Sequence, residues 1–306
     1  MLRGVTSVLQ GAPAADADVV PGPPLPLGRR VVLPGRGTTF VREVEGPPGA
    51  PTVLLLHGWM ASGGLNWFQT FDALGEHFRV LAPDHRGHGR GIRSRRRFRI
   101  GDCADDVAAL LDELGEGPVI AVGYSLGGPI AQMLWRRHPE KVEGLVLCAT
   151  AHTLMPGVRE AWIFSTMMAV AAGTTRAGQM ASKLPVSAVR SRFPITSGER
   201  AGRPSTLRSW AAAEMRRHSP RMVMEAGVAM GNYSARKWIG RVDVPTTVVV
   251  TTQDRAIPPL AQLHMALSIP GANIHRIEDG HLVCGKPAFA APIRDACLDV
   301  ASRTVA

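Results

Sequence analysis

The chain has few cysteines, and none of them lie close together. Cys103, Cys148, Cys284 and Cys297 form no Cys-x-x-Cys pair, and no Cys/His cluster has the spacing of zinc ligands. This pattern indicates neither a structural metal site nor a disulfide framework. We therefore expect no bound metal and four reduced cysteines.

Long apolar runs are also missing. A membrane-spanning helix needs a run of about 18 apolar residues, and the longest stretch here, residues 161–173, is interrupted by Ser165 and Thr166. Residues 1–20 lack the continuous apolar segment of a signal peptide. We predict no transmembrane span and a cytoplasmic protein, with peripheral membrane contact as the alternative.

Lysine is scarce, yet the chain is basic. Its 35 basic residues are 31 Arg and 4 Lys against 25 acidic residues, for a net charge of +10. Residues 152–240 hold 13 basic and 4 acidic residues, and so carry nearly all of this excess. Such charge suits nucleic acid, an anionic membrane or an anionic substrate, but no nucleic-acid-binding motif or interleaved aromatic pattern is present. We expect no nucleic acid partner. Contact of this basic segment with an anionic lipid surface, contact with an acidic substrate and a GC-rich codon preference are the remaining explanations.

A second group of basic residues lies within residues 90–99. Its members are Arg90, Arg93, Arg95, Arg96, Arg97 and Arg99, and they are followed by Asp102, Asp105 and Asp106. We predict a solvated loop that these aspartates partly neutralise, with contact to an anionic lipid surface or substrate as the alternative.

The order of apolar patterns along the chain predicts an α/β fold. Residues 1–28, rich in Ala, Pro and Gly, are expected to form a flexible leader, and a hairpin of residues 30–33 and 38–44 follows. Short apolar runs then alternate with amphipathic helices. The strands are predicted at 52–56, 79–82, 119–122, 145–147, 247–251 and 273–277, and the clearest helices at 107–114, ending at Gly115, and 126–138. This alternation predicts a mostly parallel sheet flanked by helices.

The alternation stops near residue 150 and resumes near residue 244. The intervening segment shows helical patterns, so we predict a core of residues 29–151 and 241–306 and an inserted helical cap at 152–240. This segment also holds 8 of the 12 methionines. Because methionine is flexible and polarisable, we expect an adaptable apolar pocket, although packing of the cap helices is an equal alternative.

The strongest chemical signal is the sequence Gly-Tyr-Ser-Leu-Gly at residues 123–127. It lies between a predicted strand and a predicted helix, as in a nucleophile elbow, where flanking glycines avoid collisions at a sharp turn. Ser125 is therefore the expected nucleophile, with Gly123 and Gly127 supporting the turn.

A serine nucleophile needs a base and an acid that orients the base. His281 follows the last predicted strand, and Asp254 follows the strand at 247–251. Asp243 precedes that strand and is the poorer acid, while residues 278 and 279 are too close to His281 in sequence. We predict Ser125, His281 and Asp254 as the catalytic residues.

The oxyanion of an acyl-transfer intermediate needs backbone N–H donors. We expect one from Leu126, directly after the nucleophile, and one from Trp59, in the loop that follows the strand at 52–56. His57 and Gly58 begin that loop, and Gly58 lets the backbone approach closely.

Together these motifs resemble the α/β-hydrolase superfamily over residues 30–305. The resemblance rests on His57-Gly58-Trp59, on the Asp-His-Arg-Gly-His-Gly sequence at 84–89, on the elbow, and on Asp254 and His281. It is nearest to the serine esterase and cofactor-free haloperoxidase branch, and it implies a cap inserted after the sixth strand. Arg90 departs from the small serine usual in the family. The related epoxide hydrolases and haloalkane dehalogenases use Asp at the elbow, so Ser125 argues against both.

The prediction for function is a serine hydrolase that cleaves esters of a small lipophilic substrate through an acyl-enzyme, without a cofactor. An acyltransferase or perhydrolase with the same residues is one alternative. A catalytically silent protein that binds a small apolar ligand is another, although a receptor needs no activated nucleophile. The sequence leaves the oligomeric state open.

Overall fold

The centre of the molecule is an eight-stranded sheet with the strand order β1-β2-β4-β3-β5-β6-β7-β8. The computed structural model describes residues 22–155, 158–181 and 206–304. The strands are β1 (Gly28–Leu33), β2 (Gly37–Val44), β3 (Thr52–Leu56), β4 (Arg79–Pro83), β5 (Val119–Tyr124), β6 (Val142–Cys148), β7 (Thr246–Thr251) and β8 (Asn273–Ile277).

Most neighbouring strands run parallel. β1 and β2 form the predicted antiparallel hairpin, and β2 pairs antiparallel with β4. All further pairs, from β4–β3 to β7–β8, are parallel. Every residue of β3, β5 and β7 is buried, which explains why these strands are continuous apolar runs instead of alternating ones. The predicted mostly parallel sheet is confirmed.

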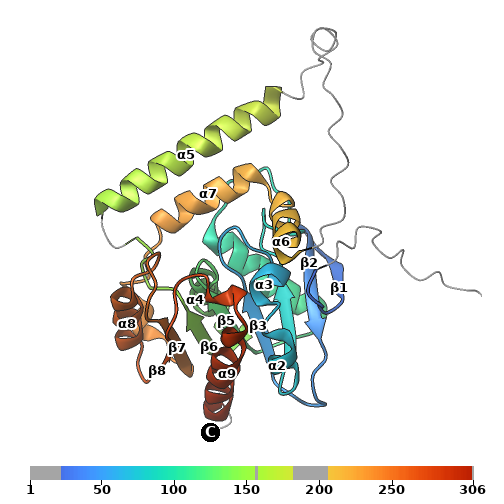
Figure 1. The fold of residues 1–306 in the computed structure, drawn as a ribbon, viewed down its shortest axis with the longest axis vertical. Coiled ribbons are helices and arrows are strands. Elements are labelled where there is room, and N and C mark those ends of the chain that lie inside the picture. Colours follow the sequence, from blue (N-terminus) through green and yellow to red (C-terminus); the bar gives the residue numbers. More distant parts are fainter. Residues whose placement is uncertain (1–21, 156–157, 182–205, 305–306) are drawn as a thin grey trace, which may run out of the picture.

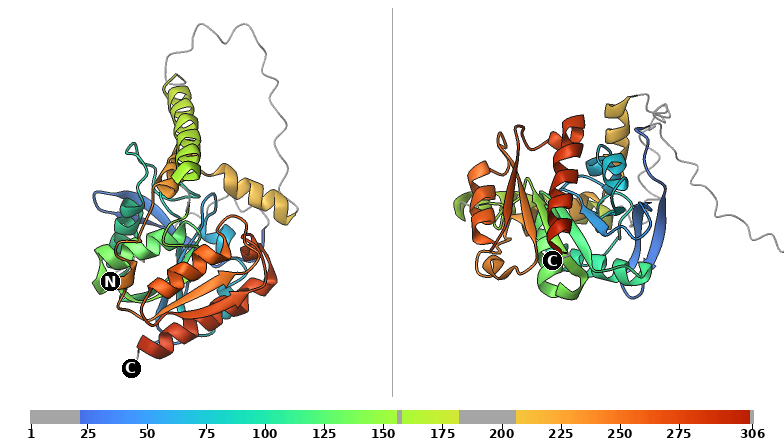
Figure 2. Two further views of the ribbon diagram at one scale, coloured as in Figure 1. Left: turned by 90° about the vertical axis from the view of Figure 1, so that its left-hand side faces the viewer. Right: turned by 90° about the horizontal axis from the view of Figure 1, so that it is seen from below.

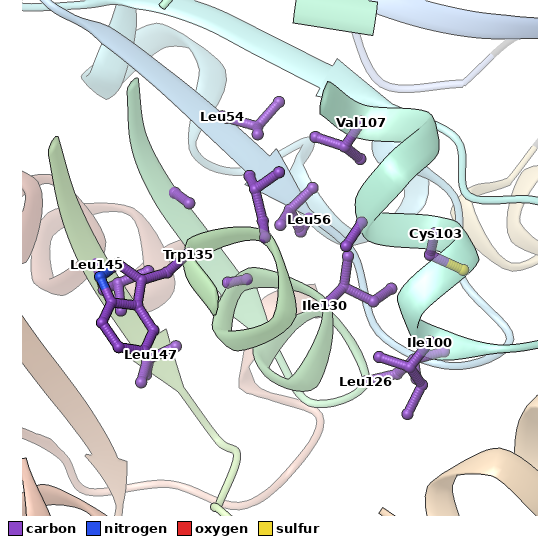
Figure 3. Close-up of a cluster of buried hydrophobic side chains, with 14 of the residues drawn as sticks. Leu54, Leu56, Ile100, Cys103, Val107, Leu126, Ile130, Trp135, Leu145 and Leu147 are labelled. Atoms are coloured by element: carbon purple, nitrogen blue, oxygen red, sulfur yellow. The ribbon is translucent and has the colours of Figure 1, made fainter. Parts of the chain in front are cut away.

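Helices cover both faces of this sheet (Figure 1). They are α1 (Gly63–Trp67), α2 (Phe71–Gly75), α3 (Ile100–Leu114), α4 (Gly127–Arg137), α5 (Val158–Ala181), α6 (Leu207–Arg216), α7 (Pro220–Gly231), α8 (Pro259–Ser268) and α9 (Ala290–Thr304). Leu54 and Leu56 of β3 pack with residues of α3, α4 and α8, whereas Val53 and Leu55 pack with residues of α2 and α9. Figure 3 shows part of the first layer, with Val107 of α3 beside Leu56.

Helix α4 and the end of helix α3 lie where the sequence predicts them, but α3 begins at Ile100 and not at the predicted residue 107. α3 ends at Leu114 because Gly115 adopts a left-handed conformation, with φ of 68°, and its N–H bonds back to the last turn. In α4, Pro129 lies in the first turn, where its missing N–H has no partner to lose.

Helices α5, α6 and α7 stand between β6 and β7, so the helical insertion after the sixth strand is present. In Figure 1, α7 lies between α5 and the sheet. The two ends of the insertion are joined by an antiparallel bridge between Thr153 and Ser234, and by a 2.7 Å hydrogen bond from the Ala235 N–H to the His152 carbonyl. Its limits, 152–240, stay a prediction, and residues 182–205 lie outside the described residues.

The end of the predicted leader is packed against the body. Leu25 contacts the core beneath β2 and β4, and Arg42 donates a 2.7 Å hydrogen bond to the Pro26 carbonyl. Burial of the Leu25 side chain offsets the entropy lost by this short segment. Residues 1–21, the rest of the predicted leader, lie outside the described residues.

The aspartates after the arginine-rich loop do not neutralise it as predicted. Asp106 pairs with Arg86 and Arg36 at 2.6 Å each, and Asp105 pairs with Arg137 at 2.7 Å. The reason is that α3 begins at Ile100, so these carboxylates project from a helix and reach Arg36 in the hairpin turn, Arg86 at the start of the loop and Arg137 of α4.

The described methionines of the insertion mainly pack helices. Met222 and Met230 are buried in the core, and Met168 of α5 lies against Gly227 of α7. Met167 and Met215 are exposed. The packing alternative therefore explains the buried ones. Across the described residues, no helix is long and apolar enough to cross a membrane, and no group of His, Cys, Asp and Glu is arranged to hold a metal ion.

Candidate active site

Three parallel strands end at the candidate site. Ser125 follows β5, Asp254 follows β7 and His281 follows β8. Because the carboxyl ends of parallel strands lie at one edge of the sheet, residues far apart in the sequence meet there.

Ser125 occupies a strained turn between β5 and α4. Its φ of 51° lies in the left-handed region, which residues other than glycine rarely adopt. A Cβ on Gly127 would lie 1.9 Å from the Leu56 carbonyl oxygen, and a Cβ on Gly123 would lie 2.5 Å from the Gly127 carbonyl oxygen. Both glycines of the predicted elbow are therefore required by the close approach of backbone segments.

A chain of hydrogen bonds links the three predicted catalytic side chains. His281 Nε2 lies 3.0 Å from Ser125 Oγ, and His281 Nδ1 lies 2.8 Å from Asp254 Oδ2. Because an ionised carboxylate only accepts, Nδ1 carries the ring proton and Nε2 accepts from the serine hydroxyl. The arrangement sets the tautomer of His281 that a general base needs.

Asp254 is held by its own strand end. Burial alone would raise the pKa of its carboxyl, but hydrogen bonds from His281, the Ile257 N–H and Thr251 outweigh that effect and lower it. Oδ1 accepts from the N–H groups of Ala256 at 2.8 Å and Ile257 at 2.9 Å, and Oδ2 accepts from Thr251 at 2.8 Å. Asp254 is thus a fixed, ionised acceptor for the His281 ring.

The alternative acids are engaged elsewhere. Asp243 accepts a 3.0 Å hydrogen bond from the Trp135 indole, and Asp279 pairs with Lys286 at 2.7 Å. Within the described part of the chain, neither carboxylate bonds to His281.

The loop after β3 passes directly beside the serine. A Cβ on Gly58 would lie 3.3 Å from the Ser125 Cβ, and the Gly58 N–H is held by Asn66 Oδ1 at 3.0 Å. The backbone N–H groups of Trp59 and Leu126 donate to no acceptor among the described residues. The two predicted oxyanion donors therefore flank the serine without an internal partner.

The His57 side chain links this loop to the loop after β4. Its Nε2 accepts the His85 N–H at 2.9 Å, so Nδ1 carries the proton and donates to the Gly58 carbonyl at 2.8 Å. Burial, together with the neighbouring His85 and His88, lowers the pKa of His57 well below its ordinary value. The ring is a neutral spacer between the loops after β3 and β4.

Helices of the insertion cover Trp59. Its indole N–H donates to the Val223 carbonyl of α7 at 2.8 Å. Its ring packs edge-on against the ring of Phe164 of α5, with 6.0 Å between the ring centroids. Trp59 also packs against the core cluster that contains Met222 and Ala226 of α7, so apolar groups from both helices lie next to it.

The junction of α6 and α7 forms hydrogen bonds with the loop after β3 and with the loop after β4. His218 Nδ1 accepts the Gly89 N–H at 2.7 Å, and its Nε2 lies 3.0 Å from the Met60 carbonyl oxygen. The Ser219 N–H donates to the Gly87 carbonyl at 2.8 Å. His218 could not be identified from the sequence, because a single histidine in a helical segment carries no pattern that distinguishes it.

A buried ion pair also attaches α6. Arg90 and Glu214 are 3.2 Å apart, with only 5% of the Glu214 side chain exposed, and Ser62 lies 3.2 Å from the same carboxylate. Asp84 links the same loops, since it accepts the Gly63 and Arg90 N–H groups at 2.7 Å each. Arg90, which stands where the family usually has a small serine, therefore helps to attach the insertion to the core.

Comparisons with known proteins agree with the fold of the chain. A family model described as the alpha/beta hydrolase fold matches residues 51–286. A poly(3-hydroxyalkanoate) depolymerase from Ectopseudomonas oleovorans is 28% identical over 249 residues, which are 77% of this chain and 80% of the depolymerase. Lipase LipV from Mycobacterium tuberculosis is 37% identical over 124 residues, 40% of this chain and 46% of the lipase. Among solved structures, an esterase from Thermogutta terrifontis has a TM-score of 0.68 at 23% identity and covers 91% of this chain and 99% of its own.

Proposed function

Because the chain belongs to the alpha/beta hydrolase family, we propose that it hydrolyses esters of lipophilic carboxylic acids through an acyl-enzyme on Ser125. The observation that carries this proposal is the hydrogen-bond chain from Ser125 Oγ through His281 to Asp254, with distances of 3.0 Å and 2.8 Å. This chain supplies the base that a serine hydroxyl needs before it can attack an ester carbonyl.

In the acylation step, Ser125 Oγ attacks the carbonyl carbon while His281 Nε2 takes the hydroxyl proton. The oxyanion that forms accepts hydrogen bonds from the backbone N–H groups of Trp59 and Leu126, each worth about 3 kcal/mol in the transition state. Asp254 stabilises the imidazolium of His281. The intermediate then collapses, and His281 gives the proton to the departing alcohol.

In the deacylation step, His281 takes a proton from water, and the resulting hydroxide attacks the acyl carbon. The second tetrahedral intermediate uses the same N–H donors. Collapse returns the proton to Ser125 Oγ and releases the carboxylic acid. No step requires a metal ion or an organic cofactor.

A lipophilic acyl group is supported by what surrounds Trp59. Phe164 of α5 lies against its ring, and Trp59 packs against the core cluster that contains Met222 and Ala226 of α7, so an acyl chain leaving Ser125 toward Trp59 meets apolar groups. The name of the depolymerase relative also describes a substrate whose repeating units are joined by esters of 3-hydroxyalkanoic acids.

A series of p-nitrophenyl esters from acetate to laurate, together with a soluble 3-hydroxyalkanoate ester oligomer, tests the proposal. We expect kcat/KM to rise roughly fourfold for each added methylene until the apolar space is filled, as the burial energy of a methylene implies. Equal rates for all chain lengths would contradict the lipophilic substrate, and absence of turnover would contradict ester hydrolysis.

Product analysis with the same substrates tests which molecule accepts the acyl group from Ser125. We expect free acid to dominate when water competes with an added alcohol or with hydrogen peroxide. Predominant transfer to the alcohol would identify an acyltransferase, and predominant peracid would identify a perhydrolase. Tight binding of a small apolar compound without turnover of any ester would identify a binding protein. We also propose a cytoplasmic location, which fractionation of cells expressing the full chain can test.

A further inference from the structure

The outer side of α5 is apolar and exposed. Trp162 is 68%, Met167 60% and Val170 63% exposed, and Ile163 is exposed as well. At about 100° per residue these four positions fall on one side of a helix. We call them the outer side of α5; Figure 2 (left) shows the helix extending beyond the rest of the described chain.

The opposite side of α5 is already covered. Ala172 is buried, and Met168 lies against Gly227 of α7. Residues 161–175 include no charged side chain, and Thr166 and Thr174 are their exposed hydroxyl residues, so this stretch lacks the charged face that a helix on a protein surface normally turns to water. Contiguous exposed apolar residues of this size mark a contact surface.

Positive charge borders this apolar side. Arg95, Arg96 and Arg97 are exposed, and no carboxylate of the described residues lies within 4.0 Å of their guanidinium groups. We call them the arginine loop. A cavity of about 350 Å³ between α5 and α7 is lined by Arg97, by Ala169, Ala172 and Gly173 of α5, and by Glu225, Val228 and Ala229 of α7. Ala169 and Gly173 are exposed, so the arginine loop lies beside one edge of the outer side of α5.

We propose that the outer side of α5 and the arginine loop bind the surface of an anionic lipid bilayer. Apolar side chains of such a helix enter the boundary between headgroups and acyl chains, and tryptophan favours that boundary. Guanidinium groups beside it pair with lipid phosphates. Two copies of the chain facing each other through this side would instead bring arginine loops of like charge together.

This surface goes beyond the proposed chemistry and does not depend on it. In Figure 1, α7 lies between α5 and the sheet, and Ser125 follows β5 of that sheet. The outer side of α5 is opposite the side that packs against α7. The Ser125→Ala variant should therefore bind vesicles as the unchanged chain does, so a failure of lipid binding and a failure of ester hydrolysis are separate results.

The test is flotation of the full chain with vesicles of phosphatidylcholine alone or with phosphatidylglycerol added. We expect binding only to the anionic vesicles, and its loss in high salt. Binding to neither kind of vesicle, or equally to both, would overturn the proposal.

Variants assign the binding to the surface. Trp162→Glu combined with Met167→Glu should abolish flotation, while Leu267→Glu, at a residue of α8 that is 78% exposed, should leave it unchanged. Replacing all three arginines of the loop by glutamine should weaken binding roughly a hundredfold, given the attraction of each basic residue to an anionic surface. Retained flotation of the double variant would overturn the proposal. So would a stable dimer in light scattering that only the double variant dissociates.

Discussion

Gly89 donates its backbone N–H to Nδ1 of His218 over 2.7 Å. That ring nitrogen must therefore be unprotonated, and the proton on Nε2 is donated to the Met60 carbonyl at 3.0 Å. Met60 directly follows Trp59 and has a φ of 57°, a conformation that its neighbours must hold in place. His218 thus joins the insertion to the backbone segment that carries the proposed oxyanion donor.

Replacing His218 by leucine should slow the chemical step. Without the ring, the loop at Met60 loses a restraint, and we expect the Trp59 N–H to move from its position, lowering kcat roughly tenfold while KM changes little. His218→Gln, which offers both an acceptor and a donor, should recover most of the rate. An unchanged kcat in the leucine variant, with only a lower melting temperature, would show that His218 acts on stability alone.

Asp254→Asn should lower kcat by about four orders of magnitude, since an amide in place of the carboxylate favours the wrong tautomer of the histidine. Asp243→Asn is the matched control. It should reduce activity little, because Asp243 contacts Trp135 on another part of the molecule. Steady-state kinetics on a p-nitrophenyl ester compare the two, and similar losses in both variants would refute the assignment of Asp254.

Gly127→Ala should destabilise the fold by about 3 kcal/mol, because the added methyl group would collide with backbone that cannot move cheaply. The new Cβ would lie 1.9 Å from the Leu56 carbonyl oxygen. Gly173→Ala in α5 is the control, since no atom lies within 4 Å of the Cβ position there. Urea unfolding of both variants measures the difference. Equal urea midpoints for the two variants would show that the turn at Ser125 accommodates a methyl group at residue 127.

The buried histidines should make the fold sensitive to acid. Burial lowers the pKa of His85 and of His88 to about 3 each, well below the ordinary value of 6.5. Between these values the unfolded chain binds protons that the folded chain excludes. The free energy of unfolding should therefore be unaffected by these groups above about pH 6.5, and fall below it by about 1.4 kcal/mol per pH unit for each ring.

Denaturant unfolding between pH 7 and pH 5 checks this expectation. His88→Asn removes one of the two rings, and the pH dependence of its unfolding free energy should be shallower by the contribution of one group. A slope identical to that of the unchanged chain would contradict the burial of His88 as a neutral ring.

The fold and the central site residues could be predicted because their signals are local. Each strand is a short apolar run, and Ser125, Asp254 and His281 lie within a few residues of a strand's end. Parallel pairing then brings them to one edge of the sheet without any further information. The hydrogen bonds among them agree with that prediction.

Contacts made by the insertion could not be predicted in this way. His218 is 129 residues from Gly89 and 158 residues from Met60 along the chain, and no periodicity relates such positions. The same holds for Arg90 and Glu214, because their pairing depends on the position in which α6 packs against the core. Charge counting also failed for Asp106, because the direction of a helix, and not proximity in sequence, decides which arginine a carboxylate meets.

Labelling with a fluorophosphonate, followed by peptide mass spectrometry, tests the central claim most directly. We predict one covalent adduct, on Ser125, because its hydroxyl has His281 Nε2 at 3.0 Å to take its proton. The Ser125→Ala variant should remain folded, take up no label and lose ester hydrolysis. An adduct on another residue, or hydrolysis that persists in Ser125→Ala at the original rate, would contradict Ser125 as the nucleophile.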